Sequence, residues 1–346
     1  MQLLIAAAGT GGHIFPALEF AKLCIVDRHE VIWIGAGQPM ECKLVPGSNI
    51  TLLSIPMSGF RGKSIANKAS SVMRLCVSIL KSIYYILSNK IECVVCFGGY
   101  VSLPVGIAAI ICRRSLVLHE QNCVLGTANK LLTKFSDLVF LGLPLAKGQN
   151  KNMQIVGNPI RGESTKDLHH STRNQSIRIY VTGGSQGSEF INQNIPLALN
   201  AMKQSLEVRH QSGFNKSAGI AELYSSNISA EIEEFYSSPQ DLLSWCDFII
   251  CRAGALTLSE AMSASRGCLM IPLPGSIDNH QFCNASYIQS SNKGIIHEEK
   301  ELEADLLNKL DDILSNKLYL DWQVSKNYID HLQAASRMLS CIVKLK

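Results

Sequence analysis

The sequence predicts an α/β protein of two domains, each built on a doubly wound parallel sheet. Short apolar runs of strand length alternate with amphipathic helical patterns through the first half of the chain. The same order of strand, glycine-rich turn and helix begins again at residue 177, after a polar stretch over residues 162–176. Because such alternation is typical of parallel sheets, we expect domains over 1–160 and 161–346, and leave open whether the last helix packs back on the first domain.

Composition narrows the class of protein. Apolar residues make up 47% of the 346 residues, enough to fill two cores, and the net charge of +4 is too weak to indicate nucleic-acid binding. The 12 cysteines are scattered singly, without C-x-x-C pairs or metal-ligand spacing, and are interpreted as small buried residues in a reducing cytoplasm. We expect no signal peptide and no transmembrane helix, because the apolar run over residues 101–112 is shorter than the roughly 20 residues a span needs.

The expected strands are short apolar runs separated by helical patterns, the longest of which covers residues 64–87. In the first domain they are residues 3–8, 30–34, 50–55, 93–97, 115–118, 138–141 and 153–156. In the second domain they are residues 177–182, 207–211, 231–235, 248–251 and 269–272. Ligands of open α/β sheets bind beyond the carboxyl ends of the strands, so two such domains facing each other would enclose a ligand in a cleft.

A glycine-rich turn, residues 9–12, follows the first strand, and His13 comes next. Backbone N–H groups in such a turn lie beside the positive end of a helix dipole, which favours a phosphate or another anion. The spacing differs from the G-x-G-x-x-G of dinucleotide folds. We place Pro16 in the first turn of the helix, where its missing N–H costs nothing. A tight turn that binds nothing remains the alternative interpretation.

Eight short motifs occur in order along nearly the whole chain. They are G-T-G-G-H (9–13), G-F-R-G-K (59–63), F-G-G-Y-V-S (97–102), H-E-Q-N (119–122), G-N-P-I-R (157–161), G-G-S-Q-G-S (183–188), H-Q-S-G (210–213) and C-R-A-G-A-L-T-L-S-E (251–260). Each is weak alone, but together the sequence resembles the bacterial membrane-associated N-acetylglucosaminyltransferases of peptidoglycan synthesis.

That resemblance implies a GT-B glycosyltransferase, with two Rossmann-like domains facing a central cleft. The enzyme would move N-acetylglucosamine from UDP-N-acetylglucosamine to the muramyl 4-hydroxyl of undecaprenyl-pyrophosphoryl-MurNAc-pentapeptide, converting lipid I to lipid II with inversion at the anomeric carbon. It would need no metal and no cofactor, and would act as a peripheral protein on the cytoplasmic face of the inner membrane, in cell-wall biogenesis, cell shape and cell division.

The resemblance also implies which residues bind the donor. Those in the second domain are Arg161, Ser185, Tyr236, Ala255, Leu256, Thr257, Leu258, Ser259, Glu260 and Gln281, and those in the first are Thr10, Gly11, Gly12 and Asn122. Ser185 would contact the diphosphate, Glu260 the ribose, Tyr236 the uracil through its backbone, and Gln281 the sugar. From the residues alone, Glu260 is equally an acid stabilised by a helix dipole, Arg161 a surface side chain, and Asn122 the cap of the next helix.

Catalysis needs a group that takes the proton of the acceptor hydroxyl. We assign that role to His13, whose ordinary pKa suits proton transfer at neutral pH, and keep His119 and Glu120 as second choices. Alternatively, His13 only binds the acceptor pyrophosphate or orders the loop. No D-x-D motif is present to hold a divalent ion, so backbone N–H groups, Ser185 and nearby cations would stabilise the leaving diphosphate. Because the second domain offers its own glycine loop, the first loop is assigned to the acceptor side.

The long helical pattern carries apolar residues at helical spacing with interspersed lysine and arginine. Ile79 and Ile83 are our candidates for association with an anionic membrane surface. An ordinary domain helix whose apolar stripe faces the sheet is the competing interpretation. For the whole chain, two other functions stay open: a UDP-N-acetylglucosamine 2-epimerase of the same architecture, and a sugar-nucleotide-binding protein without activity.

Overall fold

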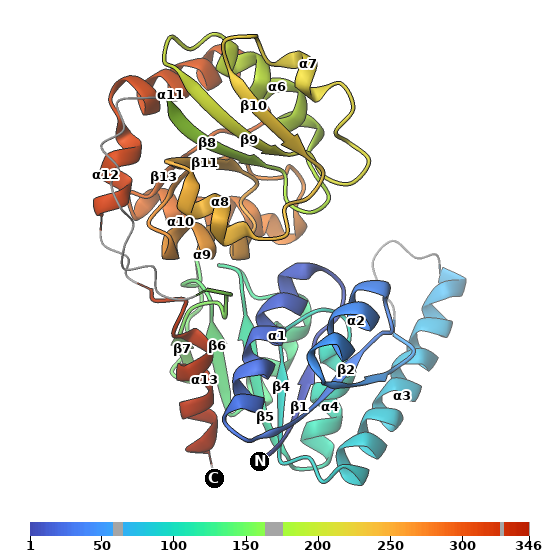
Figure 1. Cartoon of the computed structure of the whole chain (residues 1–346). Helices are drawn as coiled ribbons and strands as arrows, with labels where there is room; N and C mark the ends of the chain where they lie inside the picture. The colour runs from blue at the N-terminus through green and yellow to red at the C-terminus, as the bar shows by residue number, and fades with distance from the viewer. Residues whose placement is uncertain (58–64, 163–175, 326–328, 346) are drawn as a thin grey trace. The chain divides into compact units, whose positions relative to one another are not determined.

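A computed structural model describes residues 1–57, 65–162, 176–325 and 329–345 (Figure 1). The G-F-R-G-K motif and most of the polar stretch after Gly162 lie outside these residues. The chain divides into two compact units: Met1–Ile160 together with Ile329–Lys346, and Arg161–Tyr328. The break after Ile160 coincides with the boundary expected from the sequence, whereas the C-terminal segment belongs with the first unit.

The first unit is a seven-stranded parallel sheet with the strand order β3-β2-β1-β4-β5-β6-β7 (Figure 1). Its strands are β1 (Gln2–Ala6), β2 (Glu30–Gly35), β3 (Thr51–Ser54), β4 (Cys93–Cys96), β5 (Ser115–Glu120), β6 (Leu138–Leu141) and β7 (Met153–Ile155). Its helices are α1 (Gly11–Val26), α2 (Pro39–Leu44), α3 (Ile65–Ser88), α4 (Ser102–Ile111), α5 (Thr127–Leu132) and α13 (Ala334–Val343), with short 3-10 turns at Pro46–Ser48 and Thr133–Phe135.

Both faces of this sheet are covered, because successive residues of a strand point to opposite sides. Leu3 and Ile5 of β1 pack with residues of α1 on one face, whereas Leu4 packs with residues of α3, α4 and α5 on the other. Consequently the central strands are apolar throughout rather than alternating, which is why they read as continuous apolar runs in the sequence.

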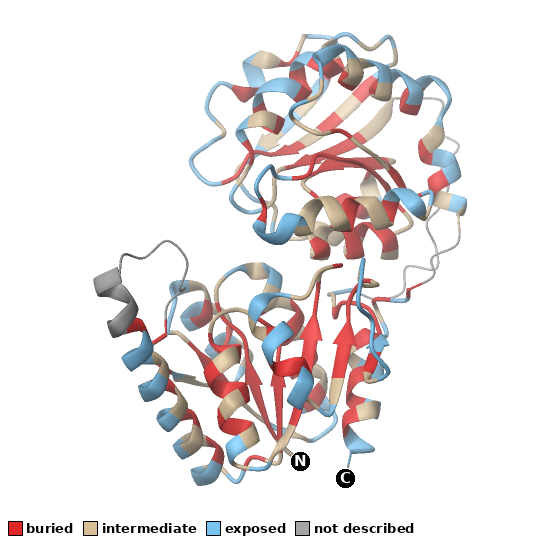
Figure 2. Ribbon diagram, turned by 180° about the vertical axis from the view of Figure 1, so that it is seen from behind, coloured by how far each residue is buried: buried red, intermediate tan, exposed pale blue. Residues whose placement is uncertain are grey.

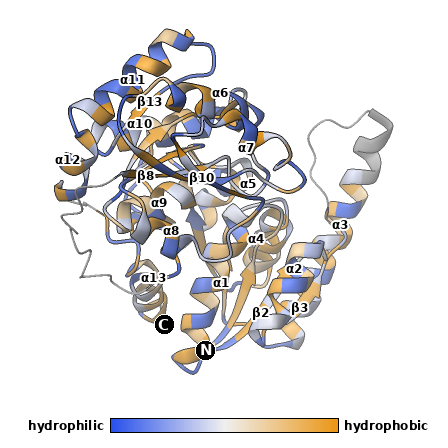
Figure 3. Cartoon of the chain, turned by 45° about the horizontal axis from the view of Figure 1, so that its top comes forward, coloured by the Kyte–Doolittle hydropathy of each residue, from blue (hydrophilic) through white to orange (hydrophobic). Residues whose placement is uncertain are grey.

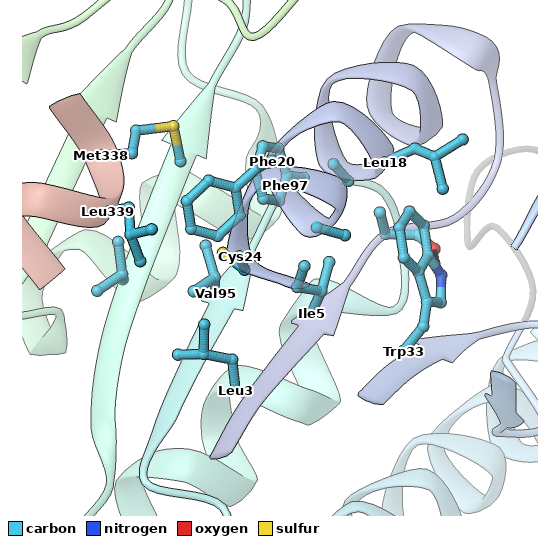
Figure 4. Packing of buried hydrophobic residues seen from close by; sticks show 14 of the residues in the cluster. Leu3, Ile5, Leu18, Phe20, Cys24, Trp33, Val95, Phe97, Met338 and Leu339 are labelled. Atoms are coloured by element: carbon cyan, nitrogen blue, oxygen red, sulfur yellow. Dashed lines mark hydrogen bonds between the residues drawn. The ribbon is translucent and has the colours of Figure 1, made fainter. Parts of the chain in front are cut away.

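The last helix, α13, packs on the first unit and not on the second. Met338, Leu339 and Ile342 lie in the same buried cluster as Phe20 and Cys24 of α1. Figure 4 shows Met338 and Leu339 beside Phe20, Cys24 and Val95. The chain therefore returns to the first unit to finish its core, so the second unit ends at Tyr328 rather than at residue 346.

The second unit repeats the architecture with six parallel strands in the order β10-β9-β8-β11-β12-β13. The strands are β8 (Ile177–Thr182), β9 (Leu206–Gln211), β10 (Ser229–Glu233), β11 (Phe248–Cys251), β12 (Gly267–Met270) and β13 (Gly294–Ile296). The helices are α6 (Glu189–Asn200), α7 (Ile220–Leu223), α8 (Pro239–Trp245), α9 (Ala255–Ser263), α10 (His280–Ser290), α11 (Glu303–Ser315) and α12 (Leu318–Val324), with a 3-10 turn at Ile277–Asn279.

Two buried clusters flank this second sheet. Residues of α6, α7, α11 and α12 cover one face, and residues of α8, α9 and α10 cover the other. Sequence analysis missed β13, whose three residues follow a polar segment and are too few to show a strand pattern. In both units the strands end at one edge of the sheet, and the glycine-rich turns follow at that edge.

Candidate active site

The first glycine-rich turn connects β1 to α1. Gly9 has a φ of +98°, a left-handed conformation that other residues rarely adopt. The helix begins at Gly11, and its N-cap, Thr10, makes no side-chain capping hydrogen bond. The first-turn N–H groups of Gly11 and Gly12 therefore precede the first helical acceptor and lie at the positive end of the dipole. Pro16 is the sixth helical residue, so its expected first-turn position is wrong: the glycines themselves form the first turn.

His13 lies on the first turn of α1 with its half-buried ring against the F-G-G-Y-V-S segment. A Cβ placed on Gly98 would come within 2.8 Å of His13 Cδ2 and 3.0 Å of Nε2. Gly98 also has a φ of +95°, so this position needs glycine both for its backbone and for the imidazole. The residue that leaves room for His13 was not singled out from the sequence, although the paired glycines of the motif carry the signal.

His119 and Glu120, our second choices for the base, are buried residues of β5 with structural partners. His119 is fully buried, which lowers its pKa to about 4, and its Nε2 lies 3.0 Å from the carbonyl oxygen of Gly157. Glu120 accepts hydrogen bonds from the N–H groups of Asn122 and Gly126 and from the side-chain amides of Asn122 and Asn129. These contacts hold the loop after β5, and His13 is the most accessible of the three candidate side chains.

Asn122 is half-buried and directs its Nδ2 to Glu120 Oε1 at 3.1 Å. The N-cap of the following helix, α5, is Gly126. The capping interpretation of Asn122 is therefore wrong, and the Glu120 carboxylate fixes the orientation of the carboxamide instead.

Glu41 of α2 is a further residue that sequence analysis missed. It is fully buried, and its carboxylate accepts the N–H groups of Ala36 (2.7 Å), Gly37 (2.9 Å), Gln38 (3.3 Å) and Gly9 (3.4 Å). One charged group thus joins the loop after β2 to the turn that carries Thr10 and His13. A glutamate in a short helical segment gives no sequence signal for this contact.

The second glycine-rich turn connects β8 to α6 and is built differently. Ser188 is the N-cap of α6, and its Oγ accepts the N–H of Ile191 at 3.3 Å. The N–H of Gly184 donates to Thr182 Oγ1 at 3.0 Å, while Ser185 at the tip is exposed. Ser188 therefore accepts one N–H of the first turn of α6, while Ser185 and Gln186 are exposed at the tip of the turn.

The N-terminus of α9 lies at the same edge of the second sheet, after β11. Its N-cap is Gly254, which has no side chain to cap the helix, so the first-turn N–H groups belong to Ala255, Leu256 and Thr257. Leu258 and Ser259 are fully buried, and Ser259 Oγ donates to the carbonyl oxygen of Ala255 at 2.8 Å. Ala255 is also buried, so three of the six residues proposed here, Ala255, Leu258 and Ser259, have buried side chains.

Glu260 is partly buried on the second turn of α9. Burial raises its pKa to about 7, and the positive charge of Arg161 opposes that rise. A pKa raised this far brings the titration of the Glu260 carboxyl into the neutral pH range. Arg161 is thus close enough to Glu260 for its charge to act on the carboxyl group.

Tyr236 lies in the loop after β10, and Gln281 is the second residue of α10. The N–H of Tyr236 donates to Gln211 Oε1 at 3.2 Å, and Gln281 Oε1 accepts the N–H of Leu273 at 2.9 Å. Asp278 and Asn279, just before Gln281, both have positive φ values, 52° and 54°. Two consecutive left-handed residues that are not glycine mark a tightly constrained loop. Within the described residues, no three histidine, cysteine or acidic side chains are grouped to hold a metal ion.

Comparison with known proteins identifies the chain. The N-terminal domain of glycosyltransferase family 28 matches residues 3–141, and the C-terminal domain of that family matches residues 178–338. This chain belongs to glycosyltransferase family 28. Its sequence is 35% identical over 315 residues to the UDP-N-acetylglucosamine–N-acetylmuramyl-(pentapeptide) pyrophosphoryl-undecaprenol N-acetylglucosamine transferase of Vibrio cholerae, covering 89% of this chain and 88% of the relative. The transferase of the same name from Marinobacter nauticus is 36% identical, with coverages of 88% and 86%.

Solved structures place the family 28 chain in the GT-B fold. The crystal structure of Acinetobacter baumannii MurG matches with a TM-score of 0.86 at 27% identity, covering 99% of each chain. CalG4, the calicheamicin glycosyltransferase, matches with a TM-score of 0.71 at 14% identity over 99% of this chain and 97% of its own, which shows the shared fold alone. The predicted fold class, the resemblance and the glycosyltransferase activity are confirmed.

Proposed function

We propose that this family 28 enzyme transfers N-acetylglucosamine from UDP-N-acetylglucosamine to the muramyl 4-hydroxyl of undecaprenyl-pyrophosphoryl-MurNAc-pentapeptide. The observation that carries the proposal is the match of about 35% identity over nearly nine-tenths of the chain to transferases named for this reaction. Both sets of residues implied by the resemblance stand at the carboxyl edges of the two sheets, where ligands of α/β domains bind.

The second unit is assigned to the donor. The uncapped N-terminus of α9 and the exposed Ser185 supply hydrogen-bond donors for a diphosphate. The Glu260 carboxylate accepts hydrogen bonds from ribose hydroxyls when ionised, and the Arg161 cation favours that ionised form. Gln281 is assigned to the sugar and the Tyr236 backbone to the uracil.

The first unit is assigned to the acceptor and to the catalytic base. In the proposed step, His13 takes the proton of the muramyl 4-hydroxyl while that oxygen attacks the anomeric carbon from the face opposite UDP. The bond from the anomeric carbon to the diphosphate oxygen breaks, a β-glycosidic bond forms, and UDP leaves with the bonding electron pair. The first-turn N–H groups at Gly11 and Gly12 suit an anionic group on this side of the reaction.

The proposed reaction is tested directly by asking whether UDP release depends on the lipid acceptor. The enzyme is mixed with UDP-N-acetylglucosamine, with and without undecaprenyl-pyrophosphoryl-MurNAc-pentapeptide, and UDP is measured together with the disaccharide product. We expect both only when the acceptor is present. UDP release without acceptor, accompanied by an epimerised sugar, indicates the 2-epimerase instead, and nucleotide binding without release under either condition indicates a protein without activity.

We further propose that the enzyme lies on an anionic membrane surface through α3. The face that α3 turns to its own unit carries Ser71, Ser78, Ser82 and Ile86, all buried, and Ser82 Oγ donates to the carbonyl oxygen of Ser78. These small residues allow close packing against α4, to which α3 is adjacent. Leu75, Ile83 and Ile86 join the apolar core on this side, and the exposed apolar side chains of α3 lie on the opposite face.

That opposite face is apolar and exposed, as the pale blue and orange stretches of α3 show (Figures 2 and 3). Its members are Val72 (58% exposed), Met73 (69%), Val77 (39%), Leu80 (67%), Tyr84 (66%) and Leu87 (54%). Ile79 and Ile83, our candidates from the sequence, are half-buried beside it, and Ile83 packs against the core of the first unit. Residues 71–88 are long and apolar enough to span a bilayer by length and composition, but Arg74 and Lys81 and the packed serine face favour a helix lying on the surface.

Vesicle flotation tests this surface. Replacing Leu80 and Tyr84 together by serine should reduce binding to anionic vesicles at least tenfold, because each exposed apolar side chain contributes about 1 kcal/mol or more when it enters the bilayer interface. Leu197→Ser, on the exposed side of α6 at 51% exposure, is the matched control and should bind as the wild type does. Unchanged flotation of a folded Leu80→Ser, Tyr84→Ser variant would exclude α3 as the membrane contact.

A further inference from the structure

Gln211 is a buried glutamine at the last position of β9, and its side chain joins the loops on both sides of that strand. β9 lies between β8 and β10 in the sheet. The Cα partners of Gln211 are Thr182 on β8 and Glu233 on β10. Its side chain is 6% exposed. A polar side chain at this point can reach the turn after β8 and the segment after β10 at the same time.

The two ends of the Gln211 amide make different contacts. Oε1 accepts the N–H of Tyr236 at 3.2 Å and the hydroxyl of Tyr180 at 3.4 Å. Nε2 donates to Thr182 Oγ1 at 3.2 Å, and the same hydroxyl oxygen accepts the N–H of Gly184 at 3.0 Å. A continuous line of hydrogen bonds therefore runs from the backbone of Tyr236, through Gln211 and Thr182, to the backbone of the second glycine-rich turn.

The buried surroundings of these hydrogen bonds restrict their movement. Thr182 and Tyr180 are buried, at 3% and 5% exposure, and the Tyr180 and Tyr236 rings meet edge to face with centroids 6.3 Å apart. Buried polar groups are costly to leave without partners. A shift of either loop would break a hydrogen bond that the other loop helps to hold, so the two loops are expected to keep a common geometry.

We propose that Gln211 is a positioning residue that couples the nucleobase half of the donor site to its diphosphate half. The inference rests on the proposed function, which assigns the Tyr236 backbone to the uracil and the turn containing Gly184 and Ser185 to the diphosphate. Gln211 contacts neither part of the ligand. It sets the distance between two backbone segments that bind opposite ends of one nucleotide. That distance is thereby kept at the value that matches the uracil-to-diphosphate distance of uridine diphosphate.

Calorimetric titration with UDP tests the coupling without requiring the lipid acceptor. Gln211→Leu, which keeps the volume but removes both contacts, should weaken UDP binding about tenfold, and Thr182→Val should weaken it about fivefold. If the two residues act through one line, the double variant should be about tenfold weaker than the wild type and not about fiftyfold. A full fiftyfold loss, or wild-type affinity in a folded Gln211→Leu protein, would overturn the coupling.

Thr182→Ser is the conservative comparison, because serine keeps the hydroxyl that accepts from Gly184 and Gln211. It should bind UDP like the wild type, and equal losses in Thr182→Ser and Thr182→Val would contradict the role of the hydroxyl. If Gln211→Leu does not fold, the comparison of Thr182→Ser with Thr182→Val still tests the proposal. Gln323→Leu is the matched control: its Nε2 donates to the carbonyl oxygen of Asp247 at the opposite edge of the sheet, so its loss should lower thermal stability and leave UDP affinity unchanged.

A readout on the wild type separates the two proposals. If the wild-type protein binds UDP no more tightly than GDP, the proposed donor itself is contradicted. Selective UDP binding that is indifferent to Gln211→Leu and to Thr182→Val would contradict the coupling alone.

Discussion

The two glycine-rich turns, residues 9–12 in the first unit and 183–187 in the second, follow equivalent first strands but lead into differently built helices. In the first, α1 starts within the glycines, and Thr10 makes no side-chain cap. In the second, α6 starts after the turn, and Ser188 caps it. In the second unit α9, behind Gly254, begins without a side-chain cap as α1 does, whereas α6, the helix that follows the similar motif, is capped.

Glycine content is similar in the two turns, and the cap formed by Ser188 is what distinguishes the start of α6 from those of α1 and α9. A capped N-terminus has used part of its donor capacity within the protein, whereas an uncapped one presents it to a ligand or to water. Four predictions test the contrast between α1 and α9 on one side and α6 on the other.

The largest effect is expected at His13, on the first turn of α1. His13→Ala should lower the rate of transfer at least about a hundredfold, since a positioned general base typically contributes 10² to 10⁴. Binding of UDP, assigned to the second unit, should be unchanged by calorimetry. His29→Ala, at the other edge of the same sheet where His29 contacts the N-terminal amine, is the control and should transfer normally. Near-normal transfer by His13→Ala removes it as the base.

The next effect concerns Glu260 on α9 and is read in the pH dependence of donor binding. The pKa of this carboxyl is raised to about 7, so acidification from pH 8 to pH 6 converts it to the neutral form. UDP affinity should fall over this range, by at most about tenfold per pH unit. Glu260→Gln should bind about tenfold more weakly at pH 8 and show a flat profile. A wild-type profile that is already flat would separate Glu260 from the ribose.

Glu260→Gln should also increase the stability of the protein in the absence of ligand. A carboxyl whose pKa is higher in the folded than in the unfolded state binds protons preferentially on folding, so stability falls as pH rises from about 4.5 to 7. Glu260→Gln removes that penalty, which partial exposure limits to about 1–2 kcal/mol. Thermal unfolding should show a higher melting temperature for Glu260→Gln at pH 8 and little difference at pH 5. A lower melting temperature at pH 8 would mean that Glu260 is stabilising.

The smallest effect is expected at the capped helix. Ser188→Ala should lower the free energy of unfolding by about 1 kcal/mol, the usual contribution of an N-cap. UDP affinity should stay within about twofold of the wild type, because the proposed diphosphate contacts are the start of α9 and Ser185, and Ser188 is buried. Denaturant unfolding and calorimetry on the same preparation give both values. A large loss of UDP affinity with unchanged stability would place α6 in the donor site and remove the contrast drawn above.

The sequence predicted the framework well where apolar runs were long and turns were marked by glycine. β8 and β11 have the bounds expected from residues 177–182 and 248–251, and both glycine-rich turns follow the first strand of their unit. The resemblance supplied the family, which no pattern of hydrophobicity could have given.

What escaped prediction depends on contacts between residues far apart in the chain. The buried face of α3 combines small serines with Ile86 and adjoins α4, whereas Leu80 and Tyr84 are exposed, a division that the apolar spacing in the sequence does not reveal. Gln211 and Glu41 accept hydrogen bonds from backbone N–H groups of other loops. The sequence pattern does not predict these partners, because they are distant along the chain. Likewise, Leu258 and Ser259 belong to a binding motif by sequence yet turn toward the core, because a helix presents only part of its circumference to a ligand.

The return of the chain to its first unit has a consequence for biosynthesis. Residues 1–160 leave the ribosome first, but the surface formed by Phe20 and Cys24 is covered only when Met338, Leu339 and Ile342 arrive. At about 5–20 residues per second, the intervening second unit delays that event by roughly ten seconds or more. The N-terminal unit is thus the first to be synthesised and the last to be completed. A chain released before α13 is synthesised would expose the apolar surface that α13 covers. Chaperones or proteases that bind exposed apolar surface could then distinguish such a chain from one that contains α13.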